Sequence, residues 1–468
     1  MVTIQDTELK EGILEAIGKA KKLSMPILVS EVQKIDNIDP LSFFAAGGER
    51  YFGERFFWKD PSDEIILVGL GISKQIQSDQ ASDRFFHVEK EWKRFISNGI
   101  IINDFKKQAT GPTMFGGFSF DPLKKKTSLW SKFSQSLFHI PKYLLTKING
   151  DVFLTTNVVC TQHDDPSIFD VLGIERQQIF SCVKPPSFSI NSHLIDELEI
   201  SPNSWKETVQ KLINDLKVGS LKKAVLAREL RLIFDENISI ELVVNNLLKE
   251  QRESFIFALE SNGDCFVGAS PERLVKKQKN SLFSTCLAGS ISRGQTVEED
   301  TLLGNVLLSD EKNLMEHQYV VEMIKDAMEQ VSIDVDIPDH PQLLKTRHIQ
   351  HLYTPVRGTS SKDSSLLQLI NLLHPTPALG GLPKQEAIEK IREVEELDRG
   401  FYASPIGWMD FEGNGEFAVA IRSGLIQGNE ASLFAGCGIV EDSDVESEYF
   451  ETQIKFRPML SALGGRTK

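Results

Sequence analysis

The chain has 468 residues, 41% of them hydrophobic and 25% charged, and its formal net charge at pH 7 is -14. This composition predicts a globular protein with a large core, and the acidic balance argues against a general binder of nucleic acid or membrane surfaces. The five cysteines form no CxxC pair and no run reaches the roughly 18 apolar residues of a membrane span, so we expect no zinc site, no membrane insertion and a cytoplasmic location.

The first part of the chain predicts one helix followed by short strands and turns. The amphipathic pattern of residues 9–17 predicts the helix, and the apolar run 65–70 predicts a buried strand closed by Gly71. Aromatic residues alternate around two glycines at 115–120, as in a strand that crosses close to another backbone. Prolines and serines at 185–189 predict a linker or a crossing loop.

Longer elements follow. The alternating segment KAVLARELRLIF at 223–234 predicts a long strand, and the runs 255–259 and 265–268 flank a turn signal typical of an antiparallel hairpin. Helical spacing of apolar residues predicts a helix over about 310–330, with Ser309 or Asp310 as its cap.

The C-terminal part predicts two strands, at 417–422 and 432–434, and a terminal helix at 446–463 that Pro458 kinks. Strands and helices in mixed order, with hairpins, favour an α+β architecture. We divide the chain into residues 1–195, an N-terminal part of the fold that is poor in motifs, and residues 196–468, a catalytic region.

Two residues of the second part suggest acid/base chemistry on a small molecule. Lys223 is a charged residue at the start of the long apolar strand and is a candidate base. Glu272, in the segment GASPERL, is a candidate acid in the same region.

Carboxylates from two predicted helices suggest a metal site. Glu316 begins the apolar stripe of the first helix, and Glu448, Glu451 and Lys455 share one face of the terminal helix. Carboxylate oxygens are ligands that Mg²⁺ accepts, and the lysine can bind an anion that the cation also contacts. The simpler alternatives are a helix-capping carboxylate at Glu316 and a surface ion pair between Glu451 and Lys455.

Further residues suggest an anion site. Arg422 lies on the polar face of its predicted strand, and the fixed fork of its guanidinium suits a carboxylate. Gly436-Cys437-Gly438 directly follows a predicted strand and can expose backbone N–H groups to an anion, although a tight turn is the commoner reason for such glycines. His351 can orient a hydroxyl or be an ordinary core histidine.

These motifs, in their order, resemble those of the chorismate-utilising enzymes, the family of isochorismate, salicylate, anthranilate and aminodeoxychorismate synthases. The resemblance covers about residues 201–465 with jointly very specific motifs, and the first 200 residues match loosely through GGFSFDP. The matching stretches are KAVLAR, GASPERL, CLAGSISRG, the Glu316-His317 pair after LLSDEKN, HLYTP, HPTPALGG, RGFYASPIGW, FAVAIRSGL, FAGCGIV and ESEYFETQIK. The resemblance implies an α+β fold in which large antiparallel sheets pack as a sandwich flanked by helices.

The resemblance also implies roles for individual residues. Lys223 is the implied base that activates water, and Glu272 the implied acid that protonates the leaving C4 hydroxyl of chorismate. Mg²⁺ is the implied cofactor, with Glu316 and Glu451 as ligands and Glu448 as a further or water-mediated one. The residues implied to bind the substrate or to line its pocket are Ala288, Gly289, His351, Arg422, Gly436, Gly438 and Lys455.

Two positions discriminate among the members of the family. Lys223 stands where the ammonia-using synthases carry glutamine, and Ala288 stands where one type of aminodeoxychorismate synthase carries lysine. The resemblance therefore implies a water-using isomerase, a Mg²⁺-dependent isochorismate synthase that acts on chorismate as a monomer or homodimer. The long N-terminal part and RGFYASPIGW favour the menaquinone-pathway form. The alternatives are a salicylate synthase, a siderophore-pathway isochorismate synthase, and a non-catalytic chorismate-binding homologue, against which the intact acid/base pair argues.

Overall fold

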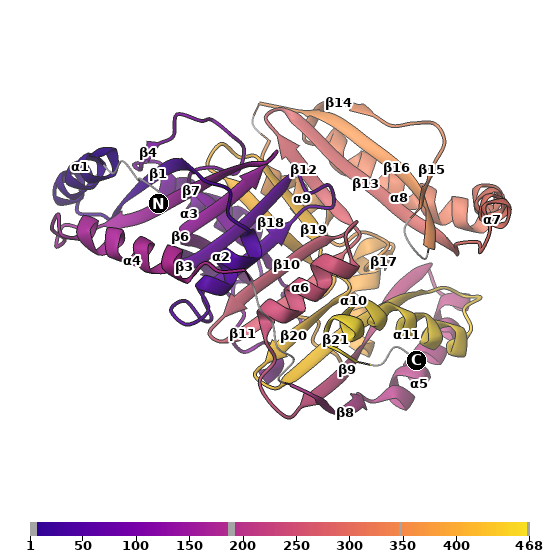
Figure 1. The fold of residues 1–468 in the computed structure, drawn as a ribbon. Coiled ribbons are helices and arrows are strands. Elements are labelled where there is room, and N and C mark those ends of the chain that lie inside the picture. The colour runs from indigo at the N-terminus through magenta and orange to yellow at the C-terminus, as the bar shows by residue number, and fades with distance from the viewer. Residues whose placement is uncertain (1–6, 186–191, 346–348, 363, 466–468) are drawn as a thin grey trace.

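The computed structural model describes residues 7–185, 192–345, 349–362 and 364–465. Its strands form two large sheets that share one strand, β6 (Ser136–Ile148), and the helices cover the outer faces and the edges (Figure 1). The linker expected at 185–189 lies outside the described residues except for Pro185.

The first sheet carries β9 (Lys223–Phe234) near one end, and all of its neighbouring strands are antiparallel except β4 beside β1. The order before β9 is β4 (Ile100–Ile102), β1 (Ile27–Ile35), β7 (Asp151–Cys160), β6, β3 (Ile65–Ser78), β2 (Arg55–Lys59), β10 (Phe255–Ser261), β11 (Asp264–Ser270), β20 (Ser423–Gln427) and β21 (Glu430–Ile439). Two short strands, β8 (Leu194–Glu199) and β17 (Gly381–Leu382), pair with different parts of the outer edge of β9.

The second sheet is also antiparallel and begins from β6. Its order is β6, β5 (Thr113–Phe118), β18 (Pro405–Asp410), β19 (Gly415–Val419), β12 (Arg273–Gln278), β13 (Ser281–Ser292) and β16 (Ile349–Ser360), with β14 (Ser332–Asp336) and β15 (Gln342–Lys345) beside β16. The two parts of the chain share both sheets, because β2 pairs with β10 and β5 pairs with β18.

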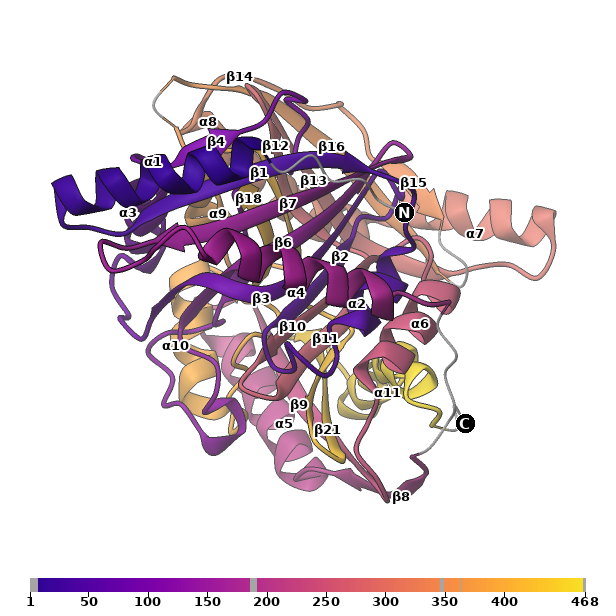
Figure 2. The same cartoon turned by 60° about the vertical axis from the view of Figure 1, so that its left-hand side comes forward.

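One hydrophobic core lies between the sheets and a second lies under the helices. Aromatic contacts tie the sheets together, such as Phe56 of β2 with Phe115 of β5 at 4.6 Å between ring centroids. The helices over the outer face of the first sheet are α1 (Thr7–Leu23), α2 (Pro40–Ala46), α4 (Ile168–Cys182), α6 (Ile240–Glu250) and α11 (Val445–Ala462) (Figure 2). This arrangement confirms the predicted α+β sandwich.

The remaining helices pack against other parts of the sandwich. A 3₁₀ turn, Ser128–Trp130, precedes β6. The α-helices are α3 (Arg84–Ile96), α5 (Pro202–Val218), α7 (Val297–Ser309), α8 (Glu311–Glu329), α9 (Leu366–Leu373) and α10 (Lys384–Val394). Each helix in the described part of the chain is too short or too polar to span a lipid bilayer.

Most predicted elements of the described chain are confirmed, including α1, β9, the β10–β11 hairpin, α8 capped by Asp310, and α11 with Pro458 inside it. The close crossing at β5 is also confirmed, because a Cβ on Gly116 would lie 1.9 Å from the Leu137 carbonyl oxygen. The prediction that Gly71 ends a strand is wrong. Gly71 adopts a φ of +66° inside β3, which continues to Ser78 along β6.

Candidate active site

The end of β21 has one open edge. β20 pairs with β21 only up to Phe434, so beyond it β9 is the only neighbouring strand in the described chain. Gly438 lies opposite Val225, whose N–H donates to the Gly380 carbonyl on the far side of β9. Val225 and Gly438 are thus a non-hydrogen-bonded pair, and the N–H and C=O groups of Gly438 and Gly436 face the open edge.

The prediction that Gly436-Cys437-Gly438 follows a strand is wrong, and so is the alternative of a tight turn, because these residues lie inside β21. Gly436 and Gly438 have no side chain, which leaves room for neighbouring residues. A Cβ on Gly438 would lie 2.5 Å from Cε of Lys223, and a Cβ on Gly436 would lie 3.3 Å from the Tyr402 hydroxyl. The two glycines therefore form a floor over which larger side chains lie.

Lys223 is the first residue of β9 and is held there by β17. It pairs with Leu382, whose carbonyl also accepts the N–H of Lys222 at 2.7 Å. The Lys223 side chain is 20% exposed, and its Nζ lies 3.6 Å from Oε2 of Glu316 on α8. Lys223 thus stands between the floor of β21 and α8.

Glu272 and Arg422 lie where the chain crosses from one sheet to the other. Glu272 belongs to the link between β11 and β12, and Arg422 to the link between β19 and β20. The Val419 N–H donates to the Glu272 carbonyl and the Ala269 N–H donates to the Arg422 carbonyl, each at 3.0 Å. The two links therefore lie side by side.

The prediction that Arg422 belongs to a strand is wrong. The strand β19 ends at Val419, and Arg422 has a φ of +51°, in the left-handed region that residues other than glycine rarely adopt. Alternation of apolar residues cannot reveal such a turn, because the turn is fixed by neighbouring links of the fold.

One electrostatic environment is shared by the side chains of Glu272, His351, Arg422 and Lys455. Burial raises the pKa of Glu272 to about 7, against the opposing charges of Arg422 and Lys455. Burial lowers the pKa of His351 to about 4, and the same two cations add to this effect. Near pH 7 a carboxyl that is partly protonated and a neutral imidazole therefore stand beside two cations.

The face of α11 that carries Glu448, Glu451 and Lys455 meets the open edge of β21. Lys455 Nζ lies 2.5 Å from Oε1 of Glu451 and donates to the Gly436 carbonyl at 2.8 Å. The ion pair considered as an alternative does form, and it lies at the site. Glu448 accepts a hydrogen bond from the Ser443 hydroxyl, and burial and the charge of Glu451 raise the pKa of Glu448.

The strands β13 and β16 form another wall. The Ser290 hydroxyl lies 2.6 Å from Nδ1 of His351, its partner across the strands. The register slips at Ala288 and Gly289, and Gly289 has a φ of +82°. Buried His317 donates from Nδ1 to the Ala288 carbonyl at 2.9 Å, so it supports this bulge from behind.

Tyr402 is a further residue of the site. It belongs to the motif RGFYASPIGW, but the sequence pattern does not identify it as a site residue. Its hydroxyl lies over Gly436, and burial raises its pKa while the charges of Arg399 and Arg422 oppose the rise. An aromatic residue in an apolar motif has the pattern of a core residue, and only the neighbouring glycine of β21 reveals its place at the site.

The carboxylates of α8 and α11 have the chemistry that a hard divalent cation requires. Glu448 and Glu451 lie close enough for the charge of one to raise the pKa of the other. Among the described residues, however, no three carboxylate, imidazole or thiol groups already stand within reach of one ion. Glu316 and Glu451 instead pair with Lys223 and Lys455. The donor set fits Mg²⁺ in kind, and two of its three members pair with lysines.

The sandwich and its edge site define an enzyme that combines a candidate acid, a candidate base and anion-binding cations. A family profile described as "chorismate binding enzyme" matches residues 14–464. The chain is 45% identical over 475 residues to isochorismate synthase MenF of Bacillus subtilis strain 168, with 100% of both chains covered. It is 34% identical to the salicylate biosynthesis isochorismate synthase of Pseudomonas aeruginosa, over 96% of this chain and 94% of that protein.

Solved structures give the same result for the fold. MenF, the menaquinone-specific isochorismate synthase from Escherichia coli, superimposes with a TM-score of 0.79 at 23% identity, over 97% of this chain and 100% of that chain. Anthranilate synthase component I from Streptococcus pneumoniae gives a TM-score of 0.70 at 19% identity, over 85% of this chain and 92% of that one. The chain belongs to the chorismate-binding enzyme family, as its motifs predict.

Proposed function

We propose that this protein is a Mg²⁺-dependent isochorismate synthase, an isomerase that interconverts chorismate and isochorismate. One observation carries the proposal: two groups suited to acid/base work flank the glycine floor of β21. Lys223 lies over Gly438, and Glu272 shares the environment of Lys455, whose ammonium binds the Gly436 carbonyl. Gly436 and Gly438 are two residues apart, about 7 Å along a strand, so the floor itself is long enough for a substituted six-membered ring.

In the forward reaction, water adds at C2 of the ring, the C4 hydroxyl leaves as water, and the two conjugated ring double bonds shift from C1–C2 and C5–C6 to C1–C6 and C4–C5. Lys223 takes a proton from the attacking water at its Nζ. Glu272, as the carboxylic acid, gives a proton to the departing hydroxyl. One water enters and one leaves, so substrate and product are isomers, and the reverse reaction exchanges the two roles.

The acid role of Glu272 is supported by its surroundings. An ordinary glutamate would be almost fully ionised at pH 7 and unable to donate a proton, whereas burial raises the pKa of Glu272 to about 7. Arg422 and Lys455 oppose this rise, and two cations beside the acid also suit a substrate that carries two carboxylates.

Binding of the substrate is proposed to use the remaining site residues. Arg422 and Lys455 supply positive charge, and the N–H groups of Gly436 and Gly438 face the same open edge. Ala288, Gly289 and His351 line the wall made by β13 and β16.

Magnesium is proposed to be held by Glu316 and Glu451, with Glu448 as a direct or water-mediated ligand. When bound, the cation supplies positive charge for a carboxylate of the substrate and offsets its repulsion by an acidic protein. Support comes from the donor chemistry, since three carboxylates on two helices are present and two of them already repel each other.

The menaquinone pathway is the destination that the comparisons favour. The 45% identical relative matched over its entire length is named MenF, whereas isochorismate synthase DhbC of Bacillus subtilis matches at 35% over 56% of this chain. The Pseudomonas relative named for salicylate biosynthesis also matches nearly full length, so a role in salicylate biosynthesis stays the second candidate. In this proposal residues 1–195 complete the sheets, residues 196–468 carry the chemistry, and the enzyme works in the cytoplasm as a monomer or homodimer.

The test incubates the protein with chorismate and Mg²⁺ and separates the products by chromatography. We expect isochorismate, formed until a fixed ratio to chorismate is reached. Salicylate with pyruvate would instead identify a salicylate synthase, and anthranilate in the presence of ammonia would overturn the choice of water as nucleophile. Bound but unchanged chorismate would identify a binding protein. Restoration of menaquinone in a bacterium without its own menaquinone-pathway isochorismate synthase tests the pathway.

A further inference from the structure

Within the described residues, the outer edge of β9 has no strand partner between its two paired segments. β17 pairs with Lys223 and Ala224, and pairing with β8 starts only at Leu230. A buried ion pair, Glu395 with Arg399, lies against this gap, and the two side chains are 4% and 3% exposed. Buried charges lose their hydration, so a buried ion pair is stable only when its polar atoms are hydrogen-bonded.

The pair supplies the hydrogen bonds that a neighbouring strand would supply. Arg399 Nη2 donates to the Val225 carbonyl at 2.6 Å, and the Ala227 N–H donates to Oε2 of Glu395 at 2.7 Å. Arg399 Nη1 also donates to the Leu379 carbonyl at 3.1 Å. The pair thus joins β9 to the loop that leads into β17, which in turn pairs with Lys223.

The geometry of the pair depends on the fork of arginine. Arg399 binds Glu395 through two nitrogens, Nε at 2.6 Å and Nη2 at 2.7 Å, and its guanidinium stacks 4.2 Å from the ring centre of Phe120. A lysine at 399 would keep the charge but could not reach the carboxylate and two carbonyls together.

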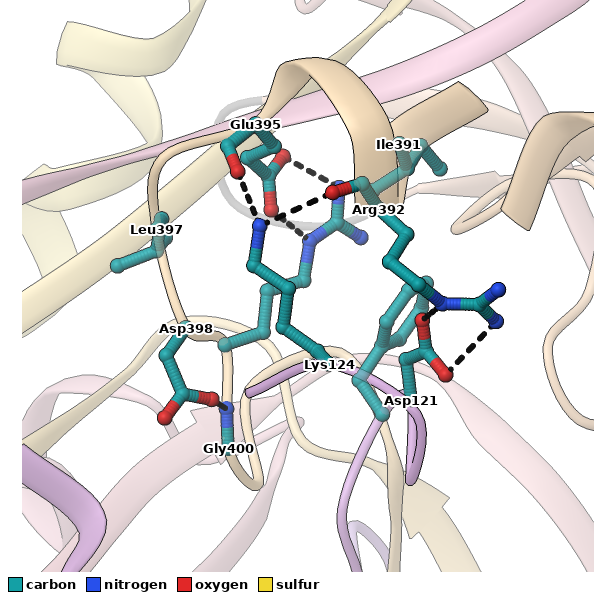
Figure 3. A pocket seen from close by; sticks show the side chains of 10 residues that line it. Asp121, Lys124, Ile391, Arg392, Glu395, Leu397, Asp398 and Gly400 are labelled. Atoms are coloured by element: carbon teal, nitrogen blue, oxygen red, sulfur yellow. Dashed lines mark hydrogen bonds and ion pairs between the residues drawn. The ribbon is translucent and has the colours of Figure 1, made fainter. Parts of the chain in front are cut away.

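The N-terminal part of the chain holds the segment that carries this pair (Figure 3). Lys124 points into the turn after α10 and donates to the carbonyls of Arg392 and Glu395. Asp121 accepts two hydrogen bonds from the Arg392 guanidinium, at 2.6 and 3.0 Å. Residues 120–124 therefore hold this segment in place where it contacts β9.

We propose that Glu395 and Arg399 are positioning residues that act as a strand partner for β9 and so fix Lys223, and that residues 120–124 hold them in place. The proposal rests on the proposed function, which makes Lys223 the base. It gives the N-terminal part a task in the reaction, since the base is aligned through a segment that this part holds.

The experiment compares Arg399→Lys and Glu395→Gln with the wild-type enzyme. We expect kcat to fall by up to about 100-fold for Arg399→Lys, because misplacement of a catalytic group by about 1 Å costs that much. The KM for chorismate and the Mg²⁺ requirement should stay near their wild-type values, since no substrate or metal group is removed. Glu395→Gln keeps an acceptor for the Ala227 N–H, so its kcat should lie between those of the wild-type enzyme and Arg399→Lys.

Amide hydrogen exchange gives a readout that does not depend on activity. The N–H groups of Val225 and Ala227 face the outer edge and should exchange faster in both variants. Those of Leu226 and Arg228 face β21 and should stay protected.

A matched control exists elsewhere in the sheet. Arg55 binds Glu260 through two nitrogens, at 3.0 and 2.6 Å, and both side chains are 1% exposed. Arg55→Lys removes the same kind of buried fork, so it should lower stability while kcat per folded molecule and exchange in β9 stay unchanged.

The outcomes separate the two proposals. An unchanged kcat in Arg399→Lys, a kcat loss no greater than that of Arg55→Lys, or unchanged exchange at Val225 and Ala227 overturns the positioning role. Should Arg399→Lys fail to fold, Glu395→Gln decides by the same criteria. A wild-type enzyme that makes no isochorismate removes the proposed function, whereas faster exchange at the outer edge of β9 would still establish the strand-partner contact.

Discussion

The carboxylate of Glu316 lies 3.6 Å from the ammonium of Lys223, and this ion pair joins α8 to the first residue of β9. The separation is just beyond that of a hydrogen bond, so the charges attract each other without fixing their orientation. Both side chains are partly exposed, which leaves each free to turn to a substrate or a cation. The proposed metal ligand and the proposed base therefore already contact one another.

Replacement of Lys223 by alanine should abolish turnover while chorismate still binds. A positioned general base contributes typically 10²–10⁴-fold to the rate, so a loss of at least about 100-fold is expected. Turnover is followed by product chromatography and binding by calorimetry. Lys222→Ala is the control, because Lys222 is the neighbouring exposed lysine and should keep its activity. Near-normal turnover in Lys223→Ala would remove Lys223 from the mechanism.

The Glu272→Gln variant should lose turnover. In the wild-type enzyme, Glu272 should cause the rate to decline at high pH. Glu272 acts as the protonated acid and its pKa is about 7, so the wild-type rate of isochorismate formation should fall as pH rises through about 7. The profile of kcat/KM against pH checks this, because it reports the pKa values of the free enzyme. A wild-type rate that stays flat from roughly one pH unit below that pKa to two units above it would contradict the acid role.

The same substitution should have the opposite effect on stability. The folded protein holds the Glu272 proton more tightly than the unfolded chain, with a pKa of about 7 against an ordinary 4.5. Wild-type stability therefore falls as pH rises from 4.5 to about 7, and this loss is complete above 7. Glutamine stays neutral, so Glu272→Gln should have the higher free energy of unfolding at pH 8 and a value close to wild type at pH 4. Urea titrations at both pH values measure the difference, and a less stable variant at pH 8 would contradict it.

Glu316→Gln and Glu451→Gln should raise the Mg²⁺ concentration needed for half-maximal activity by at least about tenfold, since outer partners of metal sites already cost 10–100-fold. Activity is measured against Mg²⁺ concentration after treatment with a chelator. Glu446→Gln is the matched control on α11, because Glu446 is exposed and pairs with Lys206. An unchanged metal requirement in both site variants would exclude them as ligands.

Gly438→Ala tests the floor of the site. The new Cβ would lie 2.5 Å from Cε of Lys223, and the end of a flexible side chain can move aside more easily than backbone can. We expect kcat to fall by about tenfold or more as Lys223 is displaced, with little change in thermal unfolding. Gly173→Ala, in α4 with open space around its Cα, should leave kcat unchanged. A normal kcat in Gly438→Ala would show that Lys223 does not need this surface.

The sequence by itself determines most elements and the residue types of the site. Side chains alternate in strands and recur every three to four residues in helices, so the pattern of nearby residues locates β9, the β10–β11 hairpin, α8 and α11. The motifs likewise give the family. These features depend on neighbours in the chain, which is why they can be predicted.

Only the tertiary structure decides how the site is assembled. Arg422 takes a left-handed turn because two inter-sheet links lie side by side, and Gly436 and Gly438 have no side chain to reveal that they form a strand. Glu395 and Arg399, at spacing i and i+4, have the pattern of a surface ion pair, yet both are buried. The physical reason is that burial, charge and strand pairing depend on residues far apart in the chain, which only the packing of the sheets brings together.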